Sequence, residues 1–121
     1  MSDKALRVKS AHPATSHFWY QRLTAIVLIP LTAWLIVFFH KSLNAPHAET
    51  LDWLRSPVNA AAACVWAIAA TYHAALGMQV VIEDYVSTIP VRRWAIRGSH
   101  LIFLVLGVAA LVAIAFILFP R

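Results

Sequence analysis

The stretch Val58–Ile82, VNAAAACVWAIAATYHAALGMQVVI, decides the fold because none of its 25 residues is charged. An α-helix rises about 1.5 Å per residue and the hydrocarbon core of a bilayer is about 30 Å thick, so roughly 20 residues cross it. Backbone amides in lipid must form their hydrogen bonds within their own segment, which favours a helix over an open strand. This stretch is therefore predicted to be a transmembrane helix.

Two more uncharged windows flank it, Leu23–Phe39 with 17 residues and Gly98–Pro120 with 23. The shorter one reaches membrane length if Arg22 or His40 extends its polar end to the interface. The 121 residues are 61% hydrophobic and 12% charged, with a mean hydropathy of +0.72, whereas soluble domains carry about twice that charged fraction. We predict an all-α membrane protein of one domain (1–121), with transmembrane helices at 20–40, 58–82 and 98–119.

The distribution of Lys and Arg predicts the orientation. The tail 1–19, the start of the first span and the connection 83–97 share one side, and 41–57 and the C-terminus share the other. The first side holds Lys4, Arg7, Lys9, Arg22, Arg92, Arg93 and Arg97, and the second holds Lys41, Arg55 and Arg121. Because cytoplasmic loops are enriched in Lys and Arg, we expect a cytoplasmic N-terminal tail, a periplasmic loop at 41–57 and a cytoplasmic loop at 83–97.

The net charge of +5 raises the question of nucleic-acid binding. The basic residues sit at the ends of the spans and form no stripe interleaved with aromatic residues, so we expect no nucleic-acid partner. Cys64 is the only cysteine and lies among alanines, which is typical of a small packing residue.

Three residues of the central span share one face. A helix turns about 100° per residue, so His73, Gly77 and Asp84 form a rough stripe, with Asp84 about 16 Å along the axis from His73. Imidazole is a common axial ligand of haem iron, and a glycine one turn away leaves room for a large flat group. The plainer alternative is that His73 hydrogen-bonds a neighbouring helix, although polar residues inside membranes usually mark a site.

A haem bound by His73 has a second axial position. His40 and His100 are the candidates within this chain, but both lie at span ends and not at the level of His73. We therefore expect a partner chain to supply the second ligand.

Two patches resemble one known family. HAALGMQVVIEDYV (73–86) and HFWYQRLTAIVLIPL (17–31) look like the hydrophobic membrane anchor subunits of succinate dehydrogenase, respiratory complex II. The resemblance implies half of a haem-binding helical bundle in the bacterial inner (cytoplasmic) membrane. It also implies three partners: a cytochrome b-type second anchor, an iron–sulfur subunit and a flavoprotein. Such a complex links the tricarboxylic acid cycle to the respiratory chain, and this subunit has no dehydrogenase activity alone.

The resemblance also implies roles for residues. His73 would be an axial ligand of haem b shared with the second anchor, and Gly77 would pack against the haem. Tyr85 would donate a hydrogen bond to a carbonyl of ubiquinone, the substrate, with Asp84 beside it. Arg22 and His17 would lie near the quinone and the haem propionates.

The chemistry of these residue types agrees with a quinone site. Reduction of a quinone takes two electrons and two protons, so the site needs a donor and a route to water. A phenol with a pKa near about 10 stays protonated, and a carboxylate at the membrane edge can relay protons. The alternative for Asp84 and Tyr85 is a solvated pair at the membrane surface. The alternative for Arg22 is an ordinary interfacial anchor.

Three other functions stay open at this point. A quinol:fumarate reductase anchor shares the architecture and runs the reaction in reverse. A small transporter or proton channel could use His73 and Asp84 as a relay, although no predicted span has a carboxylate in its interior. A structural scaffold explains the small residues but not the polar stripe.

Overall fold

The computed structural model describes the backbone of residues 2–121 and the side chains of residues 15–121. Within that part the chain folds into helices α1 (Ser2–Asn44), α2 (His47–Arg55), α3 (Pro57–Tyr85) and α4 (Ile89–Leu118). Three segments are long and apolar enough to cross a membrane, namely Thr15–Asn44 of α1, α3 and α4. The prediction of an all-α fold with three membrane-length helices is confirmed.

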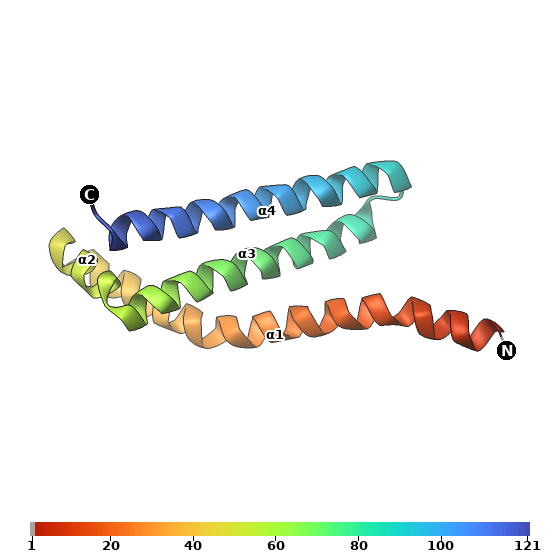
Figure 1. The fold of residues 1–121 in the computed structure, drawn as a ribbon, viewed down its shortest axis with the longest axis horizontal. Helices are drawn as coiled ribbons and strands as arrows, with labels where there is room; N and C mark the ends of the chain where they lie inside the picture. Colours follow the sequence, from red (N-terminus) through yellow and green to blue (C-terminus); the bar gives the residue numbers. More distant parts are fainter. Residues whose placement is uncertain (1) are drawn as a thin grey trace.

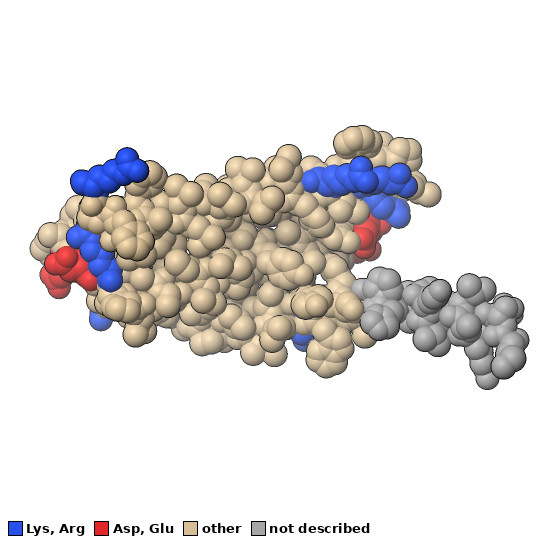
Figure 2. Space-filling model, in the orientation of Figure 1, with Lys and Arg blue, Asp and Glu red and all other residues tan. Residues whose placement is uncertain are grey.

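The three long helices form a single layer. α3 lies between α1 and α4 and runs antiparallel to both (Figure 1). The described residues of α1 and α4 make no contact with each other, so the layer does not close into a bundle. Lys, Arg, Asp and Glu side chains gather at the two ends of the layer, and the face seen in Figure 2 has an uncharged band between them. This distribution suits a layer that crosses a bilayer.

Helices extend further than the predicted spans. The predicted loop 41–57 contains α2, which begins after Pro46 and includes Trp53. The predicted loop 83–97 is helical except at 86–88, and Arg92 Nε donates to Val86 O over 2.8 Å to brace that turn. A charged residue marks the edge of the hydrocarbon and does not end a helix, because its backbone hydrogen bonds are already satisfied.

The tail 1–19 also differs from expectation in its backbone, because α1 begins at Ser2. Lys4, Arg7 and Lys9, on which the orientation partly depends, lie outside the residues whose side chains are described.

Few side chains are buried within the layer. Among the described residues, the buried ones are Ala60, Ala67, Ala69 and Leu76 of α3 and Ser99 of α4. The central helix is thus lined by small residues that let its neighbours approach. Both broad faces of the layer remain open.

α3 and α4 approach each other closely where Gly107 faces Thr71. A Cβ atom added at Gly107 would lie 3.0 Å from the Thr71 hydroxyl oxygen. That hydroxyl donates to Ala67 O over 2.7 Å, which holds it in place. The absence of a side chain at Gly107 therefore sets the distance between these helices.

α2 ties one end of the layer together. Its Trp53 ring stacks on Phe38 at 4.9 Å and on Trp34 at 5.6 Å, both from α1. Asn59 of α3 accepts from Trp34 Nε1 over 3.0 Å and donates to Trp53 O over 2.9 Å. Arg55 Nε donates to Ile117 O of α4 over 2.9 Å, so α2 reaches all three long helices.

Candidate functional site

The interface between α1 and α3 is joined by polar side chains. On α3 they recur every seven residues, which keeps them on one side of the helix. Asn59 pairs with Trp34, Trp66 with Thr32 and His73 with Thr24. His73 is thus one member of a polar row that faces α1.

His73 contacts α1 through one ring nitrogen. Its Nδ1 lies 2.9 Å from the hydroxyl oxygen of Thr24. The same hydroxyl oxygen is 2.9 Å from Tyr20 O and 3.0 Å from Gln21 O, both on its own helix. The sequence left two roles open for His73, a hydrogen bond to a neighbouring helix and a metal ligand. The imidazole makes such a hydrogen-bonding contact through Nδ1, and no hydrogen bond to a described residue involves Nε2.

Small residues flank His73 on one side of α3. Positions three before and four after a helical residue lie beside it, and here they are Ala70 and Gly77. A Cβ atom added at Gly77 would meet only Gln21 Nε2, at 3.7 Å, which is an ordinary contact. Packing between α1 and α3 therefore does not by itself require glycine at this position.

Two side chains of α1 bury polar atoms without partners. His17 Nε2 and Gln21 Oε1 have no hydrogen bond among the residues described. His17 and Gln21 are four residues apart, and Gln21 and Thr24 are three apart, so the three side chains share one side of α1. Buried polar atoms almost always have a partner, from protein, water or ligand, so this end of the α1–α3 interface has unfilled hydrogen-bonding capacity.

Asp84 and Tyr85 lie at the end of α3 and face different directions. Asp84 is eleven residues from His73, about 20° away around the helix, and Tyr85 is twelve residues away, about 120°. Tyr85 instead lies on the same side of α3 as Thr71, which packs against Gly107 of α4. Tyr85 is 85% exposed, so the structure brings it into no contact with His73.

Arg22 points away from the α1–α3 interface. It is exposed, and its guanidinium carbon lies 5.2 Å from the centre of the Phe18 ring. It forms no ion pair with Asp84; in the described part of the chain the ion pair is Arg55–Asp52, at 3.7 Å.

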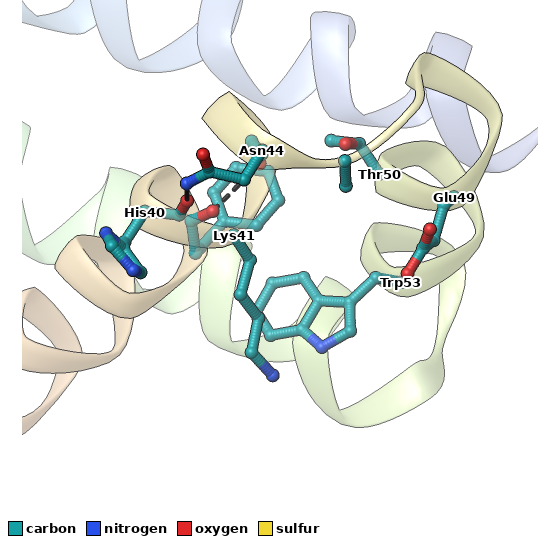
Figure 3. A pocket seen from close by; sticks show the side chains of 9 residues that line it. His40, Lys41, Asn44, Glu49, Thr50 and Trp53 are labelled. Atoms are coloured by element: carbon teal, nitrogen blue, oxygen red, sulfur yellow. Dashed lines mark hydrogen bonds between the residues drawn. The ribbon is translucent and has the colours of Figure 1, made fainter.

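The two internal candidates for a second haem ligand lie elsewhere. His100 lines a groove of about 440 Å³ between α3 and α4. His40 lines a pocket of about 390 Å³ between the end of α1 and α2, with Lys41, Glu49 and Trp53 around it (Figure 3). Neither forms a hydrogen bond with His73, and no cluster of three or more His, Cys, Asp or Glu occurs in residues whose side chains are described. Among the residues whose side chains are described, none forms a metal-binding cluster with His73.

Sequence reasoning missed the residues that fix the helices against each other. Thr24 lies within one of the two patches that carry the family resemblance, and the sequence pattern assigns no role to Asn59, Thr71 or Gly107. The polar residues within apolar windows, Thr24 and Asn59, were the available signal. Their partners depend on how the helices align, which one sequence does not specify.

Known proteins with similar sequences specify the family of this chain. Residues 2–117 match the family model described as succinate dehydrogenase/fumarate reductase transmembrane subunit. The chain is 36% identical over 111 residues to the succinate dehydrogenase hydrophobic membrane anchor subunit of Rickettsia bellii, across 92% of this chain and 89% of the relative. It is 37% identical over 112 residues to that of Rickettsia conorii, with the same coverage.

A more distant relative is the corresponding subunit of Paracoccus denitrificans, 25% identical over 76 residues, or 63% of this chain and 59% of the relative. No solved structure is significantly similar to the chain.

The fold and the polar α1–α3 interface define a class, the small integral membrane proteins with three membrane-length helices. Matches over nearly the whole length specify it further. The chain belongs to the family of succinate dehydrogenase and fumarate reductase transmembrane subunits. Its relatives named above are membrane anchor subunits of an oxidoreductase complex, so the resemblance noted from the two sequence patches is confirmed.

Proposed function

We propose that the chain anchors a succinate:quinone oxidoreductase in the bacterial inner membrane, supplies one axial ligand of a haem b and forms part of a ubiquinone-reduction site. The observation that carries the haem assignment is the contact between His73 Nδ1 and Thr24 at 2.9 Å. It leaves Nε2, the other ring nitrogen, without a hydrogen bond to a described residue and so able to bind iron.

The residues around His73 fit a haem. Ala70 and Gly77 add little side-chain bulk beside the imidazole, and no described residue comes close enough to require glycine at position 77. The unpartnered His17 Nε2 could donate to a propionate oxygen when it carries a proton, and Gln21 Oε1 could accept from water. When bound, a haem supplies a one-electron store near the quinone.

The second axial ligand would come from a cytochrome b-type second anchor. α3 is the central helix of a layer with two open faces, so a partner can approach it from either broad face. His40 and His100 line separate pockets and do not contact His73. This arrangement supports a shared haem over one held by this chain alone.

The quinone site would use the other end of α3. The Tyr85 phenol is exposed and has no described partner within the chain, so its O–H is free to donate to a quinone carbonyl oxygen. Asp84, also exposed, lies next to it and next to water, and its carboxylate can relay a proton toward the phenol oxygen. Arg22 could attract a haem propionate once its contact with Phe18 is released.

The orientation belongs to the same proposal. Arg92, Arg93 and Arg97 lie at the end of the layer that carries Asp84 and Tyr85. With the N-terminus in the cytoplasm, that end faces the compartment where the iron–sulfur and flavoprotein subunits would dock. Electrons from succinate would then reach the quinone at the cytoplasmic edge of the membrane.

The haem assignment is tested with histidine variants in the purified complex. His73→Leu should abolish the haem b absorption bands, because no other described side chain lies ready to replace the imidazole. His40→Leu and His100→Leu are matched controls and should keep those bands. An unchanged spectrum in an assembled His73→Leu complex would show that His73 is not the ligand.

A second candidate is a quinol:fumarate reductase anchor, because the matching family model covers transmembrane subunits of both enzymes. The two functions differ in direction, which depends on the cofactor potentials of the partner subunits. Succinate oxidation faster than fumarate reduction by the purified complex would favour the first.

A further inference from the structure

His73 has two ring nitrogens, and only an unprotonated one can bind a metal. In neutral imidazole one nitrogen carries the proton and the other has the free lone pair. Which nitrogen carries it is assigned from the surrounding hydrogen bonds. At His73 those bonds centre on the Thr24 hydroxyl.

The Thr24 hydroxyl has one proton and three neighbours within hydrogen-bonding distance. They are His73 Nδ1 at 2.9 Å, Tyr20 O at 2.9 Å and Gln21 O at 3.0 Å. If the proton pointed to Nδ1, the hydroxyl oxygen would face two carbonyl oxygens with no proton between them, which is repulsive. If it points to either carbonyl, the hydroxyl oxygen accepts from Nδ1–H and the contact with His73 is satisfied.

We propose that Thr24 is a positioning residue that holds His73 in the Nδ1–H tautomer and directs the free Nε2 toward the metal. This inference rests on the proposed role of His73 as a haem ligand. It adds a second residue, on a different helix, that determines whether Nε2 of His73 has a free lone pair for the metal.

Threonine is well suited to this task. Its branched Cβ restricts the side chain to few rotamers, and its back-bond to the carbonyl four residues earlier fixes the hydroxyl. Thr24 is partly buried in the α1–α3 interface, so water competes little for the contact. The imidazole is therefore held by a conformationally restricted side chain on a helix.

The Thr24 contact should also tune the bound metal. A hydrogen bond accepted from the distal N–H of a ligating imidazole raises its basicity, and losing such a bond typically weakens metal binding about 10- to 100-fold. A more basic ligand favours the more highly charged, oxidised iron. Loss of the Thr24 hydroxyl should therefore raise the midpoint potential of the haem and lower its retention.

The test uses the intact purified complex and three variants of α1. Thr24→Val keeps the shape but removes the acceptor, and Thr24→Ser restores it. Thr32→Val is the matched control, because Thr32 Oγ1 accepts from Trp66 Nε1 over 3.2 Å across the same interface, away from His73. The readouts are the haem-to-flavin ratio after detergent washing and the midpoint potential from redox titration of the haem absorption.

Thr24→Val should raise the midpoint potential and reduce haem retention, while Thr24→Ser and Thr32→Val stay close to the unaltered complex. Wild-type values in Thr24→Val would overturn the proposal, as would equal shifts in Thr32→Val or a loss in Thr24→Ser as large as in Thr24→Val. If Thr24→Val does not assemble, Thr24→Cys offers a weak acceptor and should shift the potential in the same direction; an unshifted potential there overturns the inference.

The His73→Leu complex separates the two ideas. If that variant loses haem while Thr24→Val behaves as wild type, the ligand is correct and the positioning role is wrong. If His73→Leu retains haem, the ligand assignment itself fails.

Discussion

The Thr24 hydroxyl oxygen and His73 Nδ1 lie 2.9 Å apart, although 49 residues separate them in the chain. This contact joins the two sequence patches that resemble the family, the start of the first span and the end of the second. The same side of α3 is tied to α1 at Asn59 and Trp66. The interface that carries the candidate haem ligand is therefore polar, whereas the α3–α4 interface depends on close packing of small residues.

Gly107→Ala should destabilise the α3–α4 pair. The new Cβ would lie 3.0 Å from Thr71 Oγ1, and that oxygen is held by Ala67 O, so it cannot easily yield. Overpacking of this kind costs about 1–3 kcal/mol, which exceeds the gain of up to about 1 kcal/mol from replacing a helical glycine by alanine. Thermal unfolding of the purified complex in detergent should show a lower transition temperature.

Two controls accompany this prediction. Gly98→Ala places its Cβ where nothing lies within 4 Å, so it should leave stability unchanged or slightly higher. Adding Thr71→Ala to Gly107→Ala should restore stability. Equal effects of Gly98→Ala and Gly107→Ala would show that the Thr71 contact is not what limits the approach.

Asn59→Ala should loosen the junction of α1, α2 and α3. It leaves Trp34 Nε1 without its acceptor and removes one of two donors to Trp53 O, which keeps the Ser56 N–H at 3.3 Å. Interhelical hydrogen bonds in membranes average about 0.6 kcal/mol and reach about 1.7, so the loss of both should cost about 1–2 kcal/mol. The measurement is the same thermal unfolding, with tryptophan fluorescence as a local probe of the stacked rings.

The matched control is Asn44→Ala. Asn44 Nδ2 donates to His40 O within its own exposed helix end, over 2.9 Å, so its removal should change stability by no more than a few tenths of a kcal/mol. A comparable effect of the two substitutions would contradict the bridging role of Asn59.

Tyr85→Phe should impair quinone reduction and spare succinate oxidation measured with an artificial dye. Tyr85 is 85% exposed, so removing its hydroxyl should not disturb the fold. Loss of one positioned hydrogen-bond donor in a site of this kind lowers turnover by about 10²–10³-fold. The two assays are run side by side on the purified complex.

Tyr72→Phe serves as its control, because Tyr72 lies in mid-helix and contacts Tyr20 through its ring at 6.4 Å. It should keep both activities. Parallel loss of dye and quinone activities in Tyr85→Phe would point to failed assembly, and full quinone activity would remove Tyr85 from the site.

The predicted spans and the observed helices agree in their centres and differ at their ends. The uncharged windows lie within α1, α3 and, except for Phe119 and Pro120, α4, because a long apolar segment in lipid has few alternatives to a helix. α2 was missed because its nine residues carry a mixed polar pattern, and it is positioned by the stacking of Trp53 on rings of α1. The stripe of His73, Gly77 and Asp84 followed from helical periodicity alone.

The sequence alone determined the class of protein, the number of membrane-length helices and which polar residues lie inside them, since these depend on composition and on the 100° turn of a helix. Only the tertiary structure decided that α3 is the central helix, that Thr24 meets His73 and that Thr71 packs against Gly107. Contacts between helices depend on how far one slides along the other, and two apolar helices fit at several positions. The final alignment is fixed by a few specific pairs, such as Thr71 with Gly107 and Trp34 with Asn59.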